Sequence, residues 1–284
     1  MIIYEDYNIK ELTSFKLNCK AKYVFEANNA YEIFILKYLF DYFEINYNVI
    51  GKGSKVIFDK SYITTPIILI SSNFEELYYL DNSILVSSGY DIKKLILRLA
   101  NKNIGGFHYL YPLPASIGGM TYMNASDNKV EISSFIKSVI VLDEKNNIKI
   151  LSNKECEFSY RNSIFNNKKY IILYILLNYS NIDKMTIYNE IKNAQIYRIK
   201  HQEISNTFGS IFKNGNDYKV YQLINGIKEL LPKIDELSIS EKHSNFLVNN
   251  NCKPEIVIEY IKRIKTLVLA KYNVVLKEEV NILS

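Results

Sequence analysis

The chain has 284 residues, of which 48% are hydrophobic and 23% charged, and its formal net charge is +5. This composition excludes a disordered chain and supports one large domain or two to three smaller ones. The lysines are scattered and form no basic run, so we expect no nucleic-acid partner.

The cysteines and the apolar stretches exclude further classes of protein. Cys19, Cys156 and Cys252 lie far apart without a C-x-x-C pair, so we expect no disulfide framework and no metal site. The longest apolar stretch, residues 170–177, is too short to cross a bilayer. The amino terminus carries acidic residues and no long apolar segment, so we expect no export signal and a cytoplasmic location.

The first region has the pattern of alternating strands and helix. A strand over 22–27 precedes a helix over 30–43, which is apolar on nearly every side and is therefore expected to be largely buried. Two short strands follow at 48–50 and 55–59, with the glycine turn 51–54 between them.

The middle of the chain continues this alternation. A strand over 83–88 leads to Asp91, which can cap a helix whose apolar residues follow the 3.6-residue period. After a loop rich in glycine and proline, residues 137–143 and 148–152 are expected to pair as a hairpin. Residues 170–180 are expected to form a long buried strand.

The last third is richer in helix. One helix is expected over residues 182–199, and Pro254 opens another. The inner face of this second helix should carry Ile256, Tyr260, Ile264, Leu267 and Val268. A short strand over 274–280 completes the pattern, and the whole predicts an α+β or mixed α/β fold.

Two segments with glycines are candidates for binding a phosphate group. In GKGS, residues 51–54, small residues let backbone N–H groups approach a diphosphate, although a tight turn needs the same glycines. This segment is neither a P-loop nor a G-x-G-x-x-G fingerprint. In PLPASIGGMTYMNA, residues 112–125, Ser116 can cap a helix, and Gly118 and Gly119 allow a bulky group to approach. A loop and helix packed in the core is the alternative.

Four further segments carry single polar residues in apolar or turn surroundings. FSYRNS contains Arg161, for which an exposed position is the commoner outcome, and TFGSIFKN contains Ser210 among phenylalanines. SEKHSNFLVN carries Lys242 ahead of an apolar strand, and LKEEV contains Glu279. Neither these segments nor the two with glycines are decisive alone.

The order and spacing of the segments resemble the UDP-N-acetylenolpyruvoylglucosamine reductase (UDP-N-acetylmuramate dehydrogenase) family. The matching motifs are T-S-F-K near the start, G-x-G-S before residue 60, P-x-S-I-G-G-x-x-x-M-N-A near 120, Y-R-x-S near 160, G-S-I-F-K-N near 210, K-H-x-N-F-x-V-N near 245 and L-x-x-E-V near 280. The chain is similar to the family's shorter subtype, which lacks a tyrosine-bearing lid loop. Where the family usually has G-G-G-S-N, this chain has GKGSK.

The resemblance implies an α+β fold: a two-subdomain FAD-binding fold, like that of PCMH and vanillyl-alcohol oxidase, followed by a C-terminal α+β substrate-binding domain. The expected ranges are 1–69, 70–190 and 191–284. The resemblance also implies non-covalent FAD and NADPH as co-substrate. The implied reaction reduces UDP-N-acetylglucosamine enolpyruvate, a UDP-sugar enolpyruvyl ether, to UDP-N-acetylmuramate in peptidoglycan precursor synthesis. We expect a monomer without a membrane partner.

Carried over residue by residue, the motifs imply the site residues. Arg161 would stabilise negative charge on the substrate, Ser210 would donate a proton, and Glu279 would complete the catalytic group, with Glu278 as its rival one position away. We expect Glu279 to work protonated, because it would lie near the carboxylate of the substrate. The residues implied in FAD binding are Gly51, Gly53, Ser54, Ser116, Gly118, Gly119, Asn124 and Ala125. Those implied in substrate binding are Tyr160, Lys213, Asn214 and Lys242.

Two other functions stay open at this point. One is a different FAD oxidoreductase on the same scaffold, which loss of Ser210 or Glu279 would have indicated, but both are present. The other is a catalytically silent protein that binds a sugar nucleotide without FAD, and the flavin absorbance of the purified protein distinguishes it from an enzyme.

Overall fold

The computed structural model of the chain describes residues 1–127, 130–204 and 206–284. Its contacts divide the chain into two compact units, both discontinuous in sequence. Unit 1 comprises Met1–Ile3, Phe25–Lys52 and Ile67–Tyr197, and unit 2 comprises Tyr4–Val24, Gly53–Pro66 and Arg198–Ser284. These boundaries differ from the three contiguous ranges expected from the sequence, which stay a prediction.

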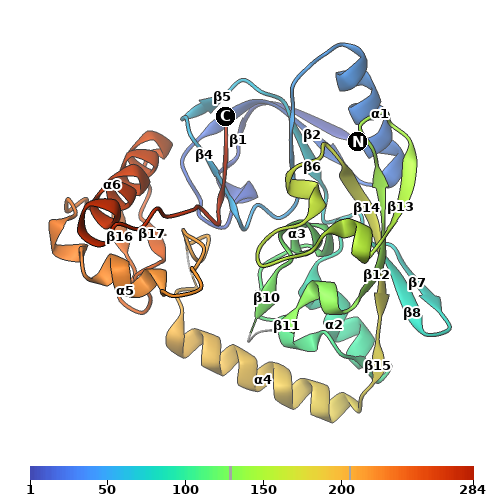
Figure 1. Cartoon of the computed structure of the whole chain (residues 1–284). Helices are drawn as coiled ribbons and strands as arrows, with labels where there is room; N and C mark the ends of the chain where they lie inside the picture. The colour runs from blue at the N-terminus through green and yellow to red at the C-terminus, as the bar shows by residue number, and fades with distance from the viewer. Residues whose placement is uncertain (128–129, 205) are drawn as a thin grey trace. The chain divides into compact units, whose positions relative to one another are not determined.

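Unit 1 holds most of the strands of the described residues, and Figure 1 labels many of them. Its helices are α1 (Ala30–Tyr42), α2 (Ile92–Ala100) and α3 (Ile117–Met123). Its strands are β3 (Asn48–Ile50), β6 (Ile67–Ile70), β7 (Leu77–Leu80), β8 (Ser83–Ser87), β9 (Ile104–Gly105), β10 (Ser126–Asp127), β11 (Val130–Glu131), β12 (Ile136–Leu142), β13 (Ile148–Ser152), β14 (Ile171–Asn178) and β15 (Ser180–Asn181). Three elements pass from one unit to the other: β1 (Ile2–Asn8), β2 (Lys20–Ala27) and α4 (Lys184–His201).

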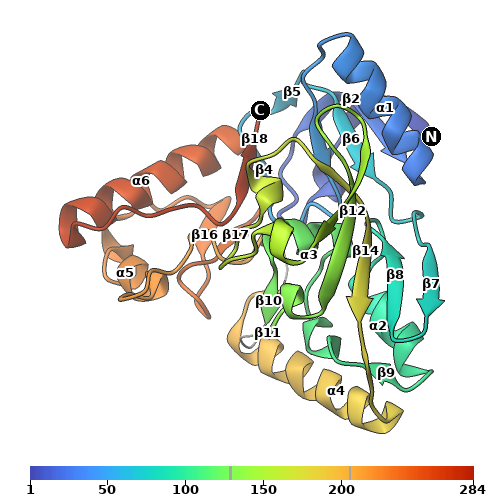
Figure 2. The ribbon, with the colours of Figure 1, turned by 45° about the vertical axis from the view of Figure 1, so that its right-hand side comes forward.

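An antiparallel five-stranded sheet with the order β13-β12-β14-β8-β7 forms the centre of unit 1. Its strands β12, β14, β8 and β7 are labelled in Figure 2. Along β14, Ile172 and Ile175 pack in one apolar cluster with residues of α2 and α3. Ile171 and Leu173 pack in a second cluster with residues of α1. A sheet that is covered on both faces explains the nearly continuous apolar run that the sequence shows here.

Helix α1 differs from the expectation of a largely buried helix. Only Ile33, Leu36, Lys37 and Phe40 are buried, whereas several of its aromatic residues are exposed. One face of α1 packs in the cluster with β6 and β14, and the remaining side chains face solvent. The uniform apolar character of this segment therefore did not indicate burial.

In the part of unit 2 that the structure describes, short strands combine with the helices α5 and α6. Its strands are β4 (Val56–Phe58), β5 (Tyr62–Ile63), β16 (Leu237–Ile239), β17 (Leu247–Asn249) and β18 (Asn281–Leu283), and its helices are α5 (Val220–Asn225) and α6 (Pro254–Tyr272). Pro254 opens α6 as predicted, but Ile256 is exposed, and Val257 and Ile261 lie on the buried face instead. The strand predicted over 274–280 is also wrong, because the last strand is β18, which pairs in parallel with β4.

The T-S-F-K motif, residues 13–16, has a structural role within unit 2. The side-chain amide of Asn249, buried at the end of β17, donates to the carbonyl oxygens of Phe15 and Lys16 at 2.8 and 2.9 Å. The ring of Phe15 packs against that of Phe208, with 4.4 Å between their centroids. These contacts join the T-S-F-K segment to the segments around residues 208 and 249.

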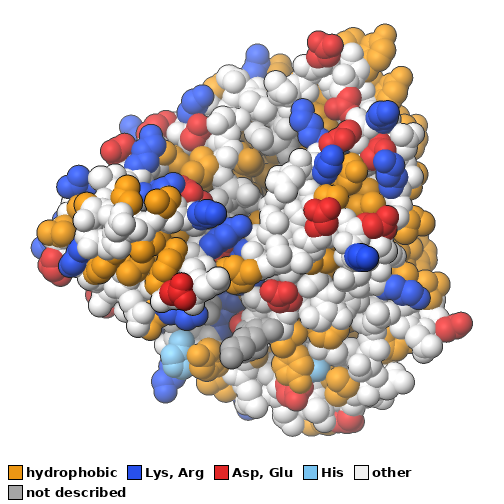
Figure 3. All heavy atoms as spheres, in the orientation of Figure 1, with side chains coloured by type: hydrophobic (Ala, Val, Ile, Leu, Met, Phe, Trp, Pro, Cys, Tyr) orange, Lys and Arg blue, Asp and Glu red, His pale blue; other side chains and the backbone are white. Residues whose placement is uncertain are grey.

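The sequence also predicted that the protein has no membrane-spanning segment and no metal site, and the described residues can be compared with these predictions. In those residues, every helix is too short or too polar to span a bilayer. They also contain no group of three or more His, Cys, Asp or Glu side chains placed to hold a metal ion. Basic and acidic side chains are interspersed over the face drawn in Figure 3.

Candidate active site

The GKGS loop joins the two units, and its two glycines have different surroundings. In unit 1, a Cβ atom on Gly51 would lie 2.7 Å from Oγ of Ser116. In unit 2, Gly53 has a φ of +58°, and a Cβ atom there would lie 2.0 Å from the carbonyl oxygen of Leu12. Gly53 is therefore required by the turn itself, independently of any ligand.

Lys52 of this loop forms an ion pair with Asp91 in unit 1. Asp91 also caps α2 as predicted, since its carboxylate accepts hydrogen bonds from the backbone N–H groups of Lys93 and Lys94. Burial tends to raise the pKa of Asp91, but the Lys52 ammonium and the two N–H donors outweigh burial and hold this pKa below its usual value. The loop is thereby tied to the start of α2.

The paired glycines of α3 also differ from each other. Ser116 caps the helix through a bond from the backbone N–H of Gly119. Gly118 is buried against Ser88, whose carbonyl oxygen accepts its N–H at 2.8 Å, and a Cβ atom on Gly118 would lie 2.6 Å from Cβ of Ser88. Gly119 is exposed, and a Cβ atom there would meet only Oγ of Ser116 at 3.4 Å. The packing of the protein therefore requires a glycine at position 118 but not at position 119.

Asn124 lies at the end of α3 in the left-handed conformation and is fully buried. Its side-chain nitrogen donates to Glu131 and to the carbonyl oxygen of Ser159, both at 3.0 Å, and its oxygen accepts the N–H of Ser133 at 3.3 Å. Ala125 follows it and bonds through its backbone to Met120. The amide of Asn124 therefore holds loops of unit 1 together.

Arg161 lies in a tight turn closed by two backbone hydrogen bonds between Ser159 and Asn162. Its φ of +52° is rare for a residue with a side chain. Nη1 donates to Oγ of Ser126 at 2.7 Å, and the guanidinium carbon lies 5.7 Å from the ring centre of Tyr160. Arg161 is therefore partly buried and held in place by these contacts. An arginine at a fully exposed surface position was the alternative.

Ser210 and Glu279 lie together in unit 2. The backbone N–H of Glu279 donates to the carbonyl oxygen of Ile211, the residue after Ser210, at 2.7 Å. The Ser210 segment is also fixed from its other side, because the buried side chain of Asn245 exchanges two hydrogen bonds with the backbone of Phe212. The structure therefore brings together two of the three predicted catalytic residues within one unit.

Lys55 contacts both of these residues. Its ammonium forms an ion pair with Oε1 of Glu279 at 2.8 Å and donates to the carbonyl oxygen of Ser210 at 2.8 Å. This ion pair places a cation beside the carboxylate of Glu279, and the expectation that Glu279 works protonated stays a prediction. The rival carboxylate, Glu278, instead forms an ion pair with Lys265 of α6 at 2.5 Å.

The residues predicted to bind substrate lie mostly at the surface. Tyr160, Asn214 and Lys242 are exposed, and Lys213 is partly exposed. The side-chain oxygen of Asn214 accepts the N–H of Val220 at 3.0 Å, and Lys242 Nζ donates to the carbonyl oxygen of Ile199 at 3.1 Å. The structure thus gives Asn214 and Lys242 contacts within the protein itself.

The sequence reasoning missed Lys55 and Asn245. Lys55 appeared only as a departure from the family's usual asparagine, and its contacts join positions far apart in the chain. Asn245 belongs to the K-H-x-N-F motif, which was noted without a role for this residue. Its position in that motif was the available signal.

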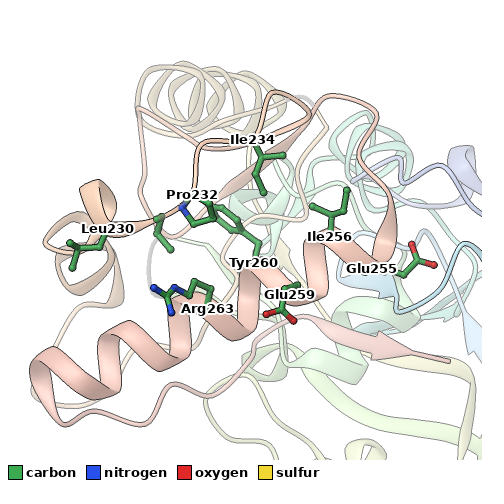
Figure 4. Close-up of a pocket in the computed structure, with 9 residues that line it drawn as sticks. Leu230, Pro232, Ile234, Glu255, Ile256, Glu259, Tyr260 and Arg263 are labelled. Carbon is green, nitrogen blue, oxygen red and sulfur yellow. The ribbon is translucent and has the colours of Figure 1, made fainter.

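A pocket of about 610 Å³ lies elsewhere on unit 2, beside α6 (Figure 4). It is lined by Leu230, Leu231, Pro232, Ile234, Glu255, Ile256, Glu259, Tyr260 and Arg263. None of the predicted site residues is among them. This pocket is therefore separate from the Ser210 and Glu279 segments.

Comparison with known proteins identifies the class of fold. The crystal structure of UDP-N-acetylenolpyruvylglucosamine reductase from Thermus caldophilus matches this structure with a TM-score of 0.81 at 22% identity, over 100% of this chain and 98% of that one. The predicted α+β, two-subdomain FAD-binding fold with a further C-terminal domain is thereby confirmed.

Sequence similarity then identifies the family. The family model for the C-terminal domain of UDP-N-acetylenolpyruvoylglucosamine reductase matches residues 200–283 of this chain. The reductase of Thermosipho melanesiensis is 30% identical over 279 residues, which cover 94% of this chain and 94% of that protein. That of Francisella tularensis is 30% identical over 98% of this chain and 97% of its own length. The chain therefore belongs to the UDP-N-acetylenolpyruvoylglucosamine reductase family, as its motifs indicated, and the prediction of an oxidoreductase is confirmed.

Proposed function

We propose that this protein reduces UDP-N-acetylglucosamine enolpyruvate to UDP-N-acetylmuramate, with FAD as its bound cofactor and NADPH as the reductant. The observation that carries the proposal is the joint placement of Ser210 and Glu279 in unit 2, in a chain that belongs to this family over nearly its whole length. Arg161, fixed in unit 1 by Ser126, supplies the third residue.

The surroundings of the small residues fit a bound FAD. Gly119 is exposed at the start of α3 and has room for a Cβ atom. Packing within the polypeptide therefore does not explain why this residue is a glycine. A large planar or phosphate-bearing group approaching the backbone would explain it. Gly51, Ser116 and Gly119 are the residues of unit 1 that would contact FAD. When bound and reduced by NADPH, the flavin would supply hydride to the substrate.

The side chains of the protein supply charge stabilisation and a proton. Reduction of the enolpyruvyl group places negative charge on the carbon beside its carboxylate, and the fixed guanidinium of Arg161 would stabilise that charge. Ser210 would donate a proton to this carbon, since an enolate is basic enough to accept it from a hydroxyl group. Glu279, paired with Lys55 beside Ser210, would help to hold this donor in place.

The Ser210→Ala variant tests this function. Reduction of the flavin by NADPH needs no proton donor for the substrate, so it should run at close to the wild-type rate. Reoxidation of the flavin by UDP-N-acetylglucosamine enolpyruvate should slow by roughly 10²–10⁴-fold, the range for a positioned general acid. Stopped-flow absorbance measures both half-reactions. Unchanged reoxidation would remove Ser210 from the mechanism.

The remaining details belong to the same proposal. We propose that the protein works as a monomer in the cytoplasm, in peptidoglycan precursor synthesis, without a nucleic-acid or membrane partner. A purified protein without flavin absorbance that still binds the UDP-sugar would favour the silent sugar-nucleotide-binding protein instead. NADPH oxidation measured with and without the enolpyruvyl substrate completes the distinction.

A further inference from the structure

We infer that Lys55 is a positioning residue, whose ammonium holds the Ser210 segment and the Glu279 carboxylate in a fixed arrangement. The inference rests on the proposed function of Ser210 and Glu279, and it assigns to Lys55 a role through them rather than a contact with the reacting atoms. All three residues belong to unit 2.

Strand pairing explains why Lys55 and Glu279 meet. β4 and β18 run parallel with Val56 opposite Asn281, and the N–H of Asn281 donates to the carbonyl oxygen of Lys55 at 2.8 Å. Lys55 and Glu279 therefore enter two neighbouring strands side by side. From that position the Lys55 ammonium reaches Oε1 of Glu279 at 2.8 Å.

The Ser210 segment passes directly against the same ammonium. Gly209 has a φ of +77°, and a Cβ atom on it would lie 3.4 Å from Nζ of Lys55. The next residue presents its carbonyl oxygen to Nζ at 2.8 Å. Since the N–H of Glu279 also bonds to Ile211, the Lys55 ammonium completes a closed set of contacts among the strands and the Ser210 segment.

Burial makes this arrangement sensitive to the charge at position 55. Glu279 is 5% exposed and the Lys55 side chain 24%, so both charges are largely removed from water. Removal of one partner from a buried ion pair costs more stability than the pair contributes when it is complete. The reason is that the remaining charge is then buried without a compensating charge. The neighbouring cation on α6, Lys265, is already paired with Glu278. A neutral residue at position 55 should therefore loosen both Glu279 and Ser210.

The test compares Lys55→Met, which removes the charge, with Lys55→Arg, which keeps a cation. Lys60→Met is the matched control, because Lys60 is an exposed residue just after β4. In stopped-flow experiments, Lys55→Met should slow flavin reoxidation by the enolpyruvyl substrate by about 10²-fold, the scale expected when a catalytic group is misplaced. Flavin reduction by NADPH should change little. Lys55→Arg should recover most of the loss, and Lys60→Met should match the wild type.

Urea unfolding gives a second readout that does not depend on turnover. If Lys55 and Glu279 stabilise each other, Lys55→Met and Glu279→Gln should each lower the unfolding midpoint. The double variant should then unfold close to the less stable single variant. If Lys55→Met does not fold, Lys55→Gln replaces it, with the same slowing of reoxidation expected.

The outcomes separate this inference from the proposed function. Strictly additive losses of stability, or wild-type reoxidation by the neutral variant of Lys55, would overturn the role of Lys55 and leave the function standing. A wild-type protein whose reduced flavin is not reoxidised by the enolpyruvyl substrate would overturn the proposed function, and the role of Lys55 with it.

Discussion

The paired glycines of α3 should respond in opposite ways to the addition of a single methyl group. In Gly118→Ala, the new Cβ atom would lie 2.6 Å from Cβ of Ser88 and 2.9 Å from its carbonyl oxygen, so either α3 or the backbone at Ser88 must move. In Gly119→Ala, the nearest atom is Oγ of Ser116 at 3.4 Å, an ordinary contact distance. The two variants differ by one position and carry the same chemical change.

The magnitudes follow from these distances. Overpacking of a buried site costs about 1–3 kcal/mol, and alanine in place of glycine inside a helix returns up to about 1 kcal/mol. We therefore expect Gly118→Ala to lower the stability of the flavin-free protein by about 1–2 kcal/mol, or roughly 2–8 °C in the unfolding midpoint. Gly119→Ala should leave the midpoint unchanged or raise it slightly.

The affinity for FAD should show a different pattern from stability. Because Gly119 is exposed and has room for a methyl group, a loss of function at this position must come from a bound group. We expect Gly119→Ala to weaken FAD binding by at least about tenfold, equivalent to about 1.4 kcal/mol. Thermal unfolding of the apoprotein and titration of FAD by flavin fluorescence measure the two effects separately.

Two results would contradict this reasoning. A wild-type unfolding midpoint in Gly118→Ala would mean that the contact with Ser88 is not tight. Normal FAD affinity in Gly119→Ala would remove Gly119 from the cofactor site. The comparison needs both variants, since a general disturbance of α3 would affect stability and affinity together in each.

Three further predictions concern other parts of the chain. Arg161→Lys should reduce turnover by about 10²-fold, because lysine keeps the charge but lacks the planar group that now bonds to Ser126; near-normal steady-state rates would make Arg161 an ordinary surface residue. FAD should leave the denatured protein, since the segments implied for it contain neither His nor Cys; flavin absorbance that stays with the precipitated polypeptide would indicate a covalent bond. Burial raises the pKa of Cys19 and of Cys156 to about 12, so a thiol reagent at pH 8 should modify these residues only after unfolding. Rapid labelling of the native protein would show that they are accessible.

Local sequence patterns predicted elements well where one physical cause dominated. Asp91 and Ser116 cap their helices as expected, because a short polar side chain before an apolar helix has few other roles. The hairpin of β12 and β13 and the long strand β14 were also predicted correctly. Helix α1 was predicted less well, because its apolar residues exceed what one packing face can cover.

The sequence motifs predicted which residues form the candidate site, but they did not predict the contacts that these residues make. The motifs located Arg161, Ser210 and Glu279, yet nothing in the local pattern indicated that Lys55 lies against the last two. That contact depends on the pairing of β4 with β18, which joins residues from opposite ends of the chain. The strand predicted over 274–280 ends before β18 begins, so even a correct topology would have given the wrong register.

The pairing of β4 with β18 also has a consequence for the synthesis of the protein. All residues between Val56 and Asn281 must be translated before β4 can pair with β18. Until then, the partner of Lys55 has not yet been synthesised. A nascent or prematurely terminated chain would therefore lack both the parallel pair and the Glu279 carboxylate, and the contacts of Lys55 with Glu279 and Ser210 would be complete only late in folding.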